Sequence, residues 1–331
     1  MREHNLREGS GKHVSTRGNK DLNRKPWKLL LWTVVAGLIF GMIGAGEAFE
    51  DQLRVTRNNL HLHNASGQIV VIRIDDQALR AYGNWPWPRR NQAQLVDRLT
   101  AAGAKRIFYD INFSYASDHA DDAAFAAALA RSGRVSMLAR SMSGPNGTNT
   151  RIDSMPLPAF TAHAQLSMGS VWYNWQNAVW HLSYAQKLGG QTVPSFASAM
   201  ANVPGETGKS FPLDYSIRVA SIPSYSAADV LSGKVNAAQL KGRDIIIGIT
   251  SDVLGDRFFI PSFGRGYGVY VHAIGAETLK NGRPVEIGWV PGFLFALAGA
   301  AISACFRPSP FERSALRLGR LETALISPRV R

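Results

Sequence analysis

Blocks of apolar residues alternate with amphipathic stretches along the middle of this chain. Between residues 69 and 139 they predict, in order, a strand, a helix, a strand, a helix and a strand. This order is typical of α/β domains, in which helical crossovers join parallel strands. We therefore predict an α/β fold with a mainly parallel sheet flanked by helices, preceded by a helical stalk at 47–67. The expected strands are 69–75, 105–113, 135–139, 213–219 and 244–250, and the expected helices are 91–102, 121–131, 194–202, 226–231 and 271–281.

A segment rich in aromatic residues, 166–187, departs from the strand–helix alternation. Its apolar and polar residues alternate only in part, which favours an antiparallel pair of strands or an insert that covers the sheet. We therefore expect a Trp-rich antiparallel insert within the α/β domain. Its aromatic side chains are Trp172, Tyr173, Trp175, Trp180 and Tyr184.

Two long runs without charged residues flank the α/β region. Leu29–Gly46 holds 18 such residues and Ile287–Phe306 holds 20, lengths that suit membrane-spanning helices. We predict transmembrane helices at 27–46 and 287–306. For the first run a cleaved signal peptide is the alternative, although its apolar core would normally be shorter. Two glycines in this run, Gly37 and Gly41, have the GxxxG spacing. This spacing lets two helices pack closely, but glycine is also common in membrane helices in general.

The positive charge of the chain is concentrated at its two ends. Of the formal net charge of +13, residues 1–28 carry +5 (eight Lys and Arg against three Asp and Glu) and residues 307–331 carry +4 (six Arg against two Glu). The central region keeps only +4, so a nucleic-acid partner is not expected. Positively charged flanks mark the cytoplasmic side of a membrane. We therefore predict an inner-membrane protein with a disordered cytoplasmic tail at 1–26, a second cytoplasmic tail at 307–331, and residues 47–286 in the periplasm.

The stretch after the first expected strand carries most of the candidate ligand-binding residues. An apolar run, Ile69–Ile74, ends in two carboxylates, and a stiff Trp-Pro-Trp-Pro segment and two arginines follow. Open α/β sheets place ligand-contacting groups at the carboxyl ends of their strands. The carboxylates could bind a cation or polarise a water, or they could cap loops and pair with arginines. The tryptophans could stack on a ligand or anchor the core. The residues expected at the site are Asp75, Asp76, Trp85, Arg89, Arg90, Asp110 and Asp256.

No spacing in the sequence identifies a catalytic or metal site. The histidines form no HxxxH or HExxH pair, and the serines lie in no GxSxG turn. Gly205–Ser210 resembles the end of a phosphate-binding loop, but Val203 replaces the required first glycine and Pro204 intrudes. The one cysteine, Cys305, permits no intramolecular disulfide. We therefore predict no catalytic residue, no metal ion and no cofactor.

Seven stretches follow one another in the central region: VVIRIDDQALRAYGNWPWPR, GAKRIFYDINFS, DDAAFAAALARSGRV, LDYSI, YSAADVLSG, LKGRDIIIGITSDVLGDRFFIPS and GVYVHAIGAETLKNGRPV. Their content and order resemble the CHASE2 family of extracytoplasmic sensory domains. The resemblance covers about residues 50 to 285, nearly the whole segment expected outside the cytoplasm.

This resemblance implies a bacterial transmembrane receptor that senses a stimulus outside the cytoplasm. In the family, membrane helices connect the sensory domain to cytoplasmic outputs, among them adenylate, guanylate and diguanylate cyclases, phosphodiesterases and kinases. The partners that follow are the membrane, an unknown small ligand, a separate output protein and a second copy of the chain. Only about 25 residues follow the second apolar run, so we expect the output from another protein or a shortened product. The alternatives are a non-enzymatic module that binds envelope proteins through 166–187 and an outward-facing hydrolase.

Overall fold

The computed structural model describes residues 26–42, 47–143, 151–174, 178–252, 254, 257–284 and 290–305. The chain divides into two units, one made of Met1–Glu50 with Ile287–Arg331 and the other of Asp51–Glu286. Helix α2 (Glu47–Leu60) crosses the boundary between them in sequence. The predicted tails at 1–26 and 307–331 lie outside the described residues, apart from Pro26.

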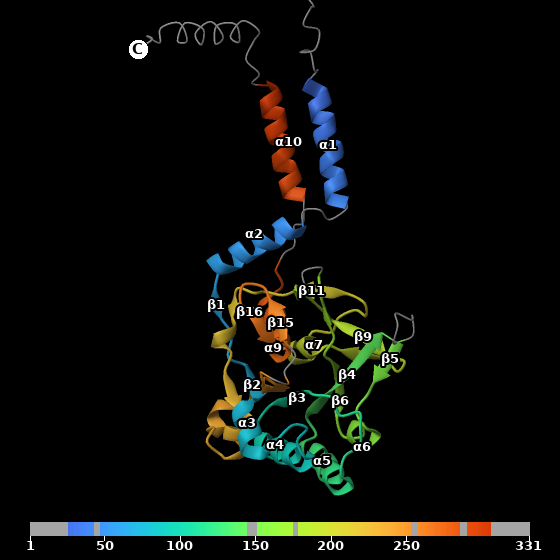
Figure 1. The fold of residues 1–331 in the computed structure, drawn as a ribbon, viewed down its shortest axis with the longest axis vertical. Coiled ribbons are helices and arrows are strands. Elements are labelled where there is room, and N and C mark those ends of the chain that lie inside the picture. Colours follow the sequence, from blue (N-terminus) through green and yellow to red (C-terminus); the bar gives the residue numbers. More distant parts are fainter. Residues whose placement is uncertain are drawn as a thin grey trace, which may run out of the picture. The chain divides into compact units, whose positions relative to one another are not determined.

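Two apolar helices make up the described part of the first unit. Helices α1 (Pro26–Met42) and α10 (Val290–Cys305) lie side by side (Figure 1). A Cβ atom on Gly37 would lie 2.5 Å from Cδ2 of Phe293, so the contact between the helices depends on a glycine at this position. Large apolar side chains remain exposed on both helices; Trp32 is 68% exposed and Phe295 is 80% exposed.

The described helices are shorter than the membrane spans predicted at 27–46 and 287–306. Helix α1 has 17 residues and helix α10 has 16. Within the described ranges, none of the helices combines the length and the apolar character that crossing a membrane requires.

A seven-stranded sheet, parallel except at one edge, forms the centre of Asp51–Glu286. Its order is β13-β2-β14-β3-β4, with β6 parallel and β5 antiparallel to β4. Both faces of the central strands are buried, which explains why these strands are continuous apolar runs in the sequence. The predicted α/β fold with a mainly parallel sheet is therefore confirmed. The strands are β2 (Ile69–Ile74), β3 (Arg106–Asp110), β4 (Val135–Ser143), β5 (Arg151–Ser154), β6 (Gln165–Met168), β13 (Ser224–Ser226) and β14 (Asp244–Ile249).

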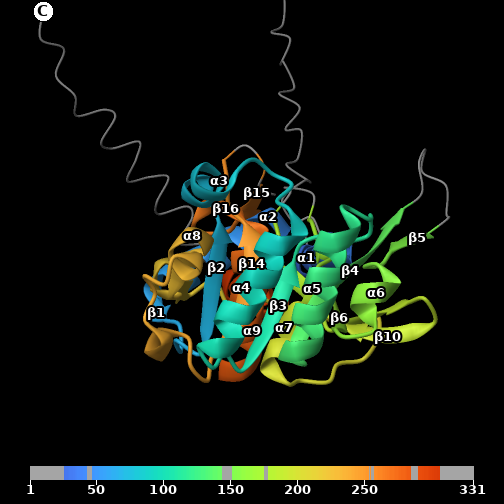
Figure 2. The same ribbon diagram turned by 90° about the horizontal axis from the view of Figure 1, so that it is seen from below.

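Helices cover both faces of this sheet and enclose two apolar cores (Figure 2). On one face, Ile72 and Ile247 belong to the core that the helices of the strand crossovers close. On the other face, Val71 and Ile246 belong to the core that α7 and α9 close. The crossover helices are α3 (Asp76–Tyr82), α4 (Arg89–Ala101), α5 (His119–Ser132), α6 (Pro158–Thr161) and α8 (Ala227–Leu231), and the helices of the opposite face are α7 (Phe196–Ala201) and α9 (Gly268–Asn281).

Short strand pairs and 3-10 turns surround the main sheet. Strand β1 pairs in parallel with β12, whereas the remaining short strands pair antiparallel, as β9 with β10, β15 with β16, and β8 with both β7 and β11. These elements are β1 (His63–Asn64), β7 (Val171–Trp172), β8 (His181–Ser183), β9 (Ala185–Leu188), β10 (Gln191–Pro194), β11 (Ser210–Pro212), β12 (Ile217–Arg218), β15 (Arg257–Ile260), β16 (Gly264–Tyr267), η2 (Val219–Ser221) and η3 (Ala237–Gln239).

A buried ion pair joins two neighbouring strands at their amino-terminal ends. Both carboxylate oxygens of Asp244 accept hydrogen bonds from Arg106, from Nε and Nη2, each at 2.8 Å. The Nζ atom of Lys280 lies 3.4 Å from the same carboxylate. The carboxylate of Asp244 lies inside the protein, because the residue is only 2% exposed, whereas the Arg106 side chain is 24% exposed.

The segment that leads into the sheet is tied to the last helix of the second unit. The carboxylate of Glu277, on α9, is fully buried and accepts hydrogen bonds from the backbone N–H of Ser66 at 2.9 Å and from its hydroxyl at 2.8 Å. On α2, the Asp51 carboxylate accepts a hydrogen bond from the Asn174 side chain at 3.0 Å. The chain entering the domain is therefore fixed by polar contacts as well as by apolar packing.

The predicted helices and strands form with shifted ends, and one predicted strand is wrong. Ser226 caps α8 by accepting a hydrogen bond from the N–H of Ala228. The strand expected at 213–219 is absent over most of its length, because Asp214 turns the chain by accepting a hydrogen bond from the N–H of Ser216 at 3.0 Å. Only Ile217–Arg218 remains as a strand.

The aromatic segment at 166–187 contributes more to the core than to the surface. Val171 and Trp172 of β7 pair antiparallel with β8, but the Trp-rich antiparallel insert expected at 166–187 is not confirmed. Trp180 and Tyr184 are buried in the core beneath α7 and α9, whereas Tyr173 is half exposed. Trp175 lies outside the described residues.

Candidate ligand-binding site

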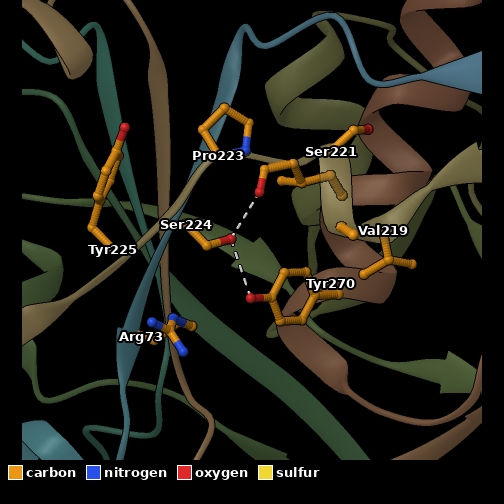
Figure 3. Close-up of a pocket in the computed structure, with 9 residues that line it drawn as sticks. Arg73, Val219, Ser221, Pro223, Ser224, Tyr225 and Tyr270 are labelled. Carbon is orange, nitrogen blue, oxygen red and sulfur yellow. Dashed lines mark hydrogen bonds between the residues drawn. The ribbon is translucent and has the colours of Figure 1, made fainter.

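A cavity of about 410 Å³ opens beside the edge strand β13 of the main sheet (Figure 3). This volume lies within the range of pockets that hold small molecules. The cavity is formed by β2, by the stretch from η2 to β13, and by the first turn of α9. Its lining residues are Arg73, Val219, Ala220, Ser221, Ile222, Pro223, Ser224, Tyr225 and Tyr270.

The register of the sheet places the cavity near the carboxyl end of β2. Strand β13 pairs with β2 so that Ser224 faces Val71, and the backbone N–H of Val71 donates to the carbonyl of Pro223 at 2.9 Å. Arg73 follows two residues later on the same face of β2. The pairing of β13 with β2 therefore fixes the position of the Arg73 side chain relative to the hydroxyl of Ser224.

Arg73 supplies the positive charge of the cavity. Its Nη2 atom lies 3.4 Å from Oδ2 of Asp75, and its side chain is 36% exposed. Its Nε atom is buried and has no hydrogen-bond partner among the residues that the structure describes. A buried guanidinium N–H without an acceptor is unfavourable, but a ligand oxygen can reach only the exposed part of the Arg73 side chain.

Three hydroxyl groups of the cavity, those of Ser221, Ser224 and Tyr270, are engaged with the protein itself. Figure 3 shows the Tyr270 hydroxyl directed at Ser224, to which it donates at 3.1 Å, and Ser224 donates in turn to the carbonyl of Ile222 at 3.0 Å. The Ser221 hydroxyl accepts from the N–H of Ala65 at 2.8 Å and donates to the carbonyl of Arg218 at 2.6 Å. These bonds fix the walls of the cavity, and Arg73 is its charged donor.

Of the residues predicted at the site, Asp75 is the one that contacts the charged lining residue of the cavity. It caps α3 by accepting a hydrogen bond from the N–H of Ala78 at 3.0 Å, and it accepts another from the Ser226 hydroxyl at 2.7 Å. Asp76 follows as the first residue of α3 and is partly buried. The two neighbouring carboxylates therefore have different roles, because only Asp75 holds Arg73.

Arg89 and Arg90 lie at a separate place, where α4 meets the first turn of α5. The Nε atom of Arg89 lies 3.6 Å from Asp122, and that of Arg90 lies 3.3 Å from Asp121. Burial lowers the pKa of Arg89 from its ordinary value, and the Asp122 carboxylate opposes this effect. Trp85 packs on the buried ring of Trp87, whose centroid is 6.4 Å away. These contacts are structural, and they do not bring the arginines to the cavity.

Asp110 lies at the carboxyl end of β3, beside the buried imidazole of His272. The two side chains approach to 3.9 Å, between Nε2 and Oδ2. Burial lowers the pKa of His272, and the nearby Asp110 carboxylate opposes this effect. Asp256 lies outside the described residues. The predicted site residues are thus distributed over several places and do not form one site.

Sequence reasoning missed Arg73, Ser224 and Tyr270, which form the polar part of the cavity. One signal was present, because Arg73 is the single charged residue within the apolar run Ile69–Ile74. Ser224 carries no such signal, because it lies on a three-residue edge strand that is too short to show a pattern, and Tyr270 lies in the first turn of α9, far away in the sequence. Within the described ranges, no three His, Cys, Asp or Glu side chains gather as a metal site would require.

Comparison with known proteins identifies the family to which this chain belongs. The model of the CHASE2 domain matches residues 29–305, which is most of the chain. No curated protein matches the chain, and no solved structure matches it either. With this match, the resemblance seen in the sequence is confirmed, and the chain belongs to the CHASE2 domain family.

Proposed function

We propose that this protein is the sensing portion of a bacterial transmembrane receptor. The match to the CHASE2 domain carries the proposal, because the family consists of sensory domains and the match covers residues 29–305. In this proposal, residues 47–286 sense a stimulus in the periplasm. The signal passes to a cytoplasmic output of the cyclase, diguanylate cyclase or kinase type.

Membrane attachment through two helices is the second part of the proposal. The proposed spans, 27–46 and 287–306, are uncharged apart from Lys28 and include residues beyond the described ends of α1 and α10. Both described helices expose large apolar side chains, which is unfavourable in water and favourable in lipid. The basic segments 1–26 and 307–331 support cytoplasmic ends and insertion in the inner membrane.

Reporter fusions test this topology. We propose inserting alkaline phosphatase, which is active only outside the cytoplasm, between Gly189 and Gly190, an exposed two-residue turn between β9 and β10. The matched fusion carries the same enzyme after Arg331. We expect activity from the internal insertion alone, and the reverse pattern from a fluorescent protein that folds only in the cytoplasm. Fluorescence from the internal position would contradict the proposal.

A further inference from the structure

The cavity beside β13 has the chemistry of an anion site with room for a small organic molecule. A guanidinium offers N–H donors in a planar fork that matches the two oxygens of a carboxylate. In Arg73, the Asp75 carboxylate approaches the Nη2 atom at 3.4 Å, and 36% of the side chain remains exposed. An anion arriving in the cavity would meet the exposed part of this cation.

The charges of Arg73 and Asp75 favour an anionic ligand with one negative charge over a ligand with two. The positive charge of Arg73 is already balanced by the Asp75 carboxylate. A monoanion leaves this group of charges at −1, whereas a phosphate dianion would leave it at −2, next to a carboxylate that repels it. The side chains of Val219 and Pro223, which are partly exposed, add apolar surface, which a bare inorganic anion would not use.

We infer that the cavity binds a small organic monocarboxylate, with Arg73 as the residue that binds the carboxylate and the wall from Val219 to Pro223 as the surface for the organic part. This inference deepens the proposed sensory function by naming the class of its stimulus. It concerns binding alone, and no bond is made or broken.

The position of the cavity explains how a bound carboxylate would reach the rest of the protein. The lining residue Ser221 is hydrogen-bonded to the N–H of Ala65, in the segment that follows the end of α2 at Leu60. The lining residue Tyr270 belongs to α9, the last helix before residues 285–289 and α10. A ligand in the cavity therefore touches elements attached to both chain ends of the second unit.

Titration calorimetry on the full-length chain in detergent micelles tests the inference. The probes are sodium lactate, butanoate and phenylacetate, each compared with its neutral amide, and inorganic phosphate. We expect at least one carboxylate to bind, its amide to bind about tenfold more weakly or not at all, and phosphate not to compete, because the charge-assisted hydrogen bonds are lost in the amide.

Two variants locate the binding site. Arg73→Gln is expected to weaken the bound carboxylate about tenfold or more, because the cation is lost. Ala220→Trp fills the cavity from its exposed rim without changing Arg73, and it is expected to abolish binding. Arg131→Gln removes an exposed arginine of α5 that does not line the cavity, and it serves as the matched control with unchanged affinity.

Three results would overturn the inference: no binding by any carboxylate at millimolar concentration, equal binding by Ala220→Trp, or binding of phosphate in preference to the carboxylates. The inference also remains testable if Arg73→Gln fails to fold, since Ala220→Trp keeps the native charges. Calorimetry reads binding on the isolated protein. A negative result there would leave the membrane topology measured by the reporter fusions unaffected, and a failed topology would not change the calorimetry.

Discussion

The buried ion pair between Arg106 and Asp244 offers the sharpest test of how the sheet is held together. We predict that Asp244→Ala destabilises the second unit by about 3 kcal/mol, at the low end of the roughly 3–5 kcal/mol expected when one partner of a buried pair is removed. The low end applies because Arg106 is 24% exposed and keeps the carbonyl acceptors of Ala199 and Met200. For a unit of this size, such a loss lowers the melting temperature by roughly 6–12 °C.

The assay is urea unfolding of the full-length chain, followed by tryptophan fluorescence, with the melting temperature measured in parallel. Asp97→Ala is the matched control, because the Asp97 carboxylate accepts hydrogen bonds from the same two arginine atoms, Nε and Nη2 of Arg131, at 3.2 and 2.7 Å. This pair lies on the exposed surface. We expect this control to change stability little, since solvent screens an exposed pair. Equal destabilisation by the two substitutions would refute the argument that burial gives the Asp244 pair its strength.

Two further predictions concern buried aromatic and imidazole rings. Burial lowers the pKa of His272 below its ordinary 6.5, so the unfolded state binds this proton before the folded state does as the pH falls. The contribution of His272 to the free energy of unfolding is therefore fully present above pH 6.5 and is lost as the pH falls toward the lowered pKa. The Asp110 carboxylate limits this loss, because it opposes the lowering of the pKa. His272→Gln should flatten the dependence of urea stability on pH between about 7.5 and 5, and an unchanged slope would assign it to other groups. Trp87→Phe should lower the free energy of unfolding by about 2 kcal/mol in the same assay, because it removes part of a buried ring and the hydrogen bond from Nε1 to the carbonyl of Gly83 at 2.8 Å. An unchanged midpoint of urea unfolding would contradict this prediction.

The parallel sheet could be predicted from the sequence because its central strands are buried on both faces. Strands β2 and β14 are continuous apolar runs, and the amphipathic stretches between strands mark the crossover helices. The ends of elements were less predictable, because they depend on local hydrogen bonds between side chains and backbone. The strand expected at 105–113 ends at Asp110, and Asn112 then accepts a hydrogen bond from the N–H of Ser114 at 2.9 Å.

The candidate site was predictable only in part, because its residues come together through pairing between distant segments. The rule that ligands bind at the carboxyl ends of strands led to Asp75, which holds Arg73. It also led to Arg89, whose partner Asp122 is brought to it by the packing of α4 on α5. Nothing in the local sequence around Ser224 indicates that it pairs with β2 and places a hydroxyl beside Arg73. Such contacts depend on tertiary structure and leave no periodic pattern.

The hydrogen bonds between Glu277 and Ser66 have a mechanical consequence. They join the segment by which the chain enters the second unit to the helix by which it leaves, through one carboxylate without access to solvent. Separating the two would strip that carboxylate of both donors inside an apolar core, at a steep energetic cost. A shift of the segment around Ser66 would therefore either break these hydrogen bonds or move α9 with it, which couples the two ends of the domain mechanically.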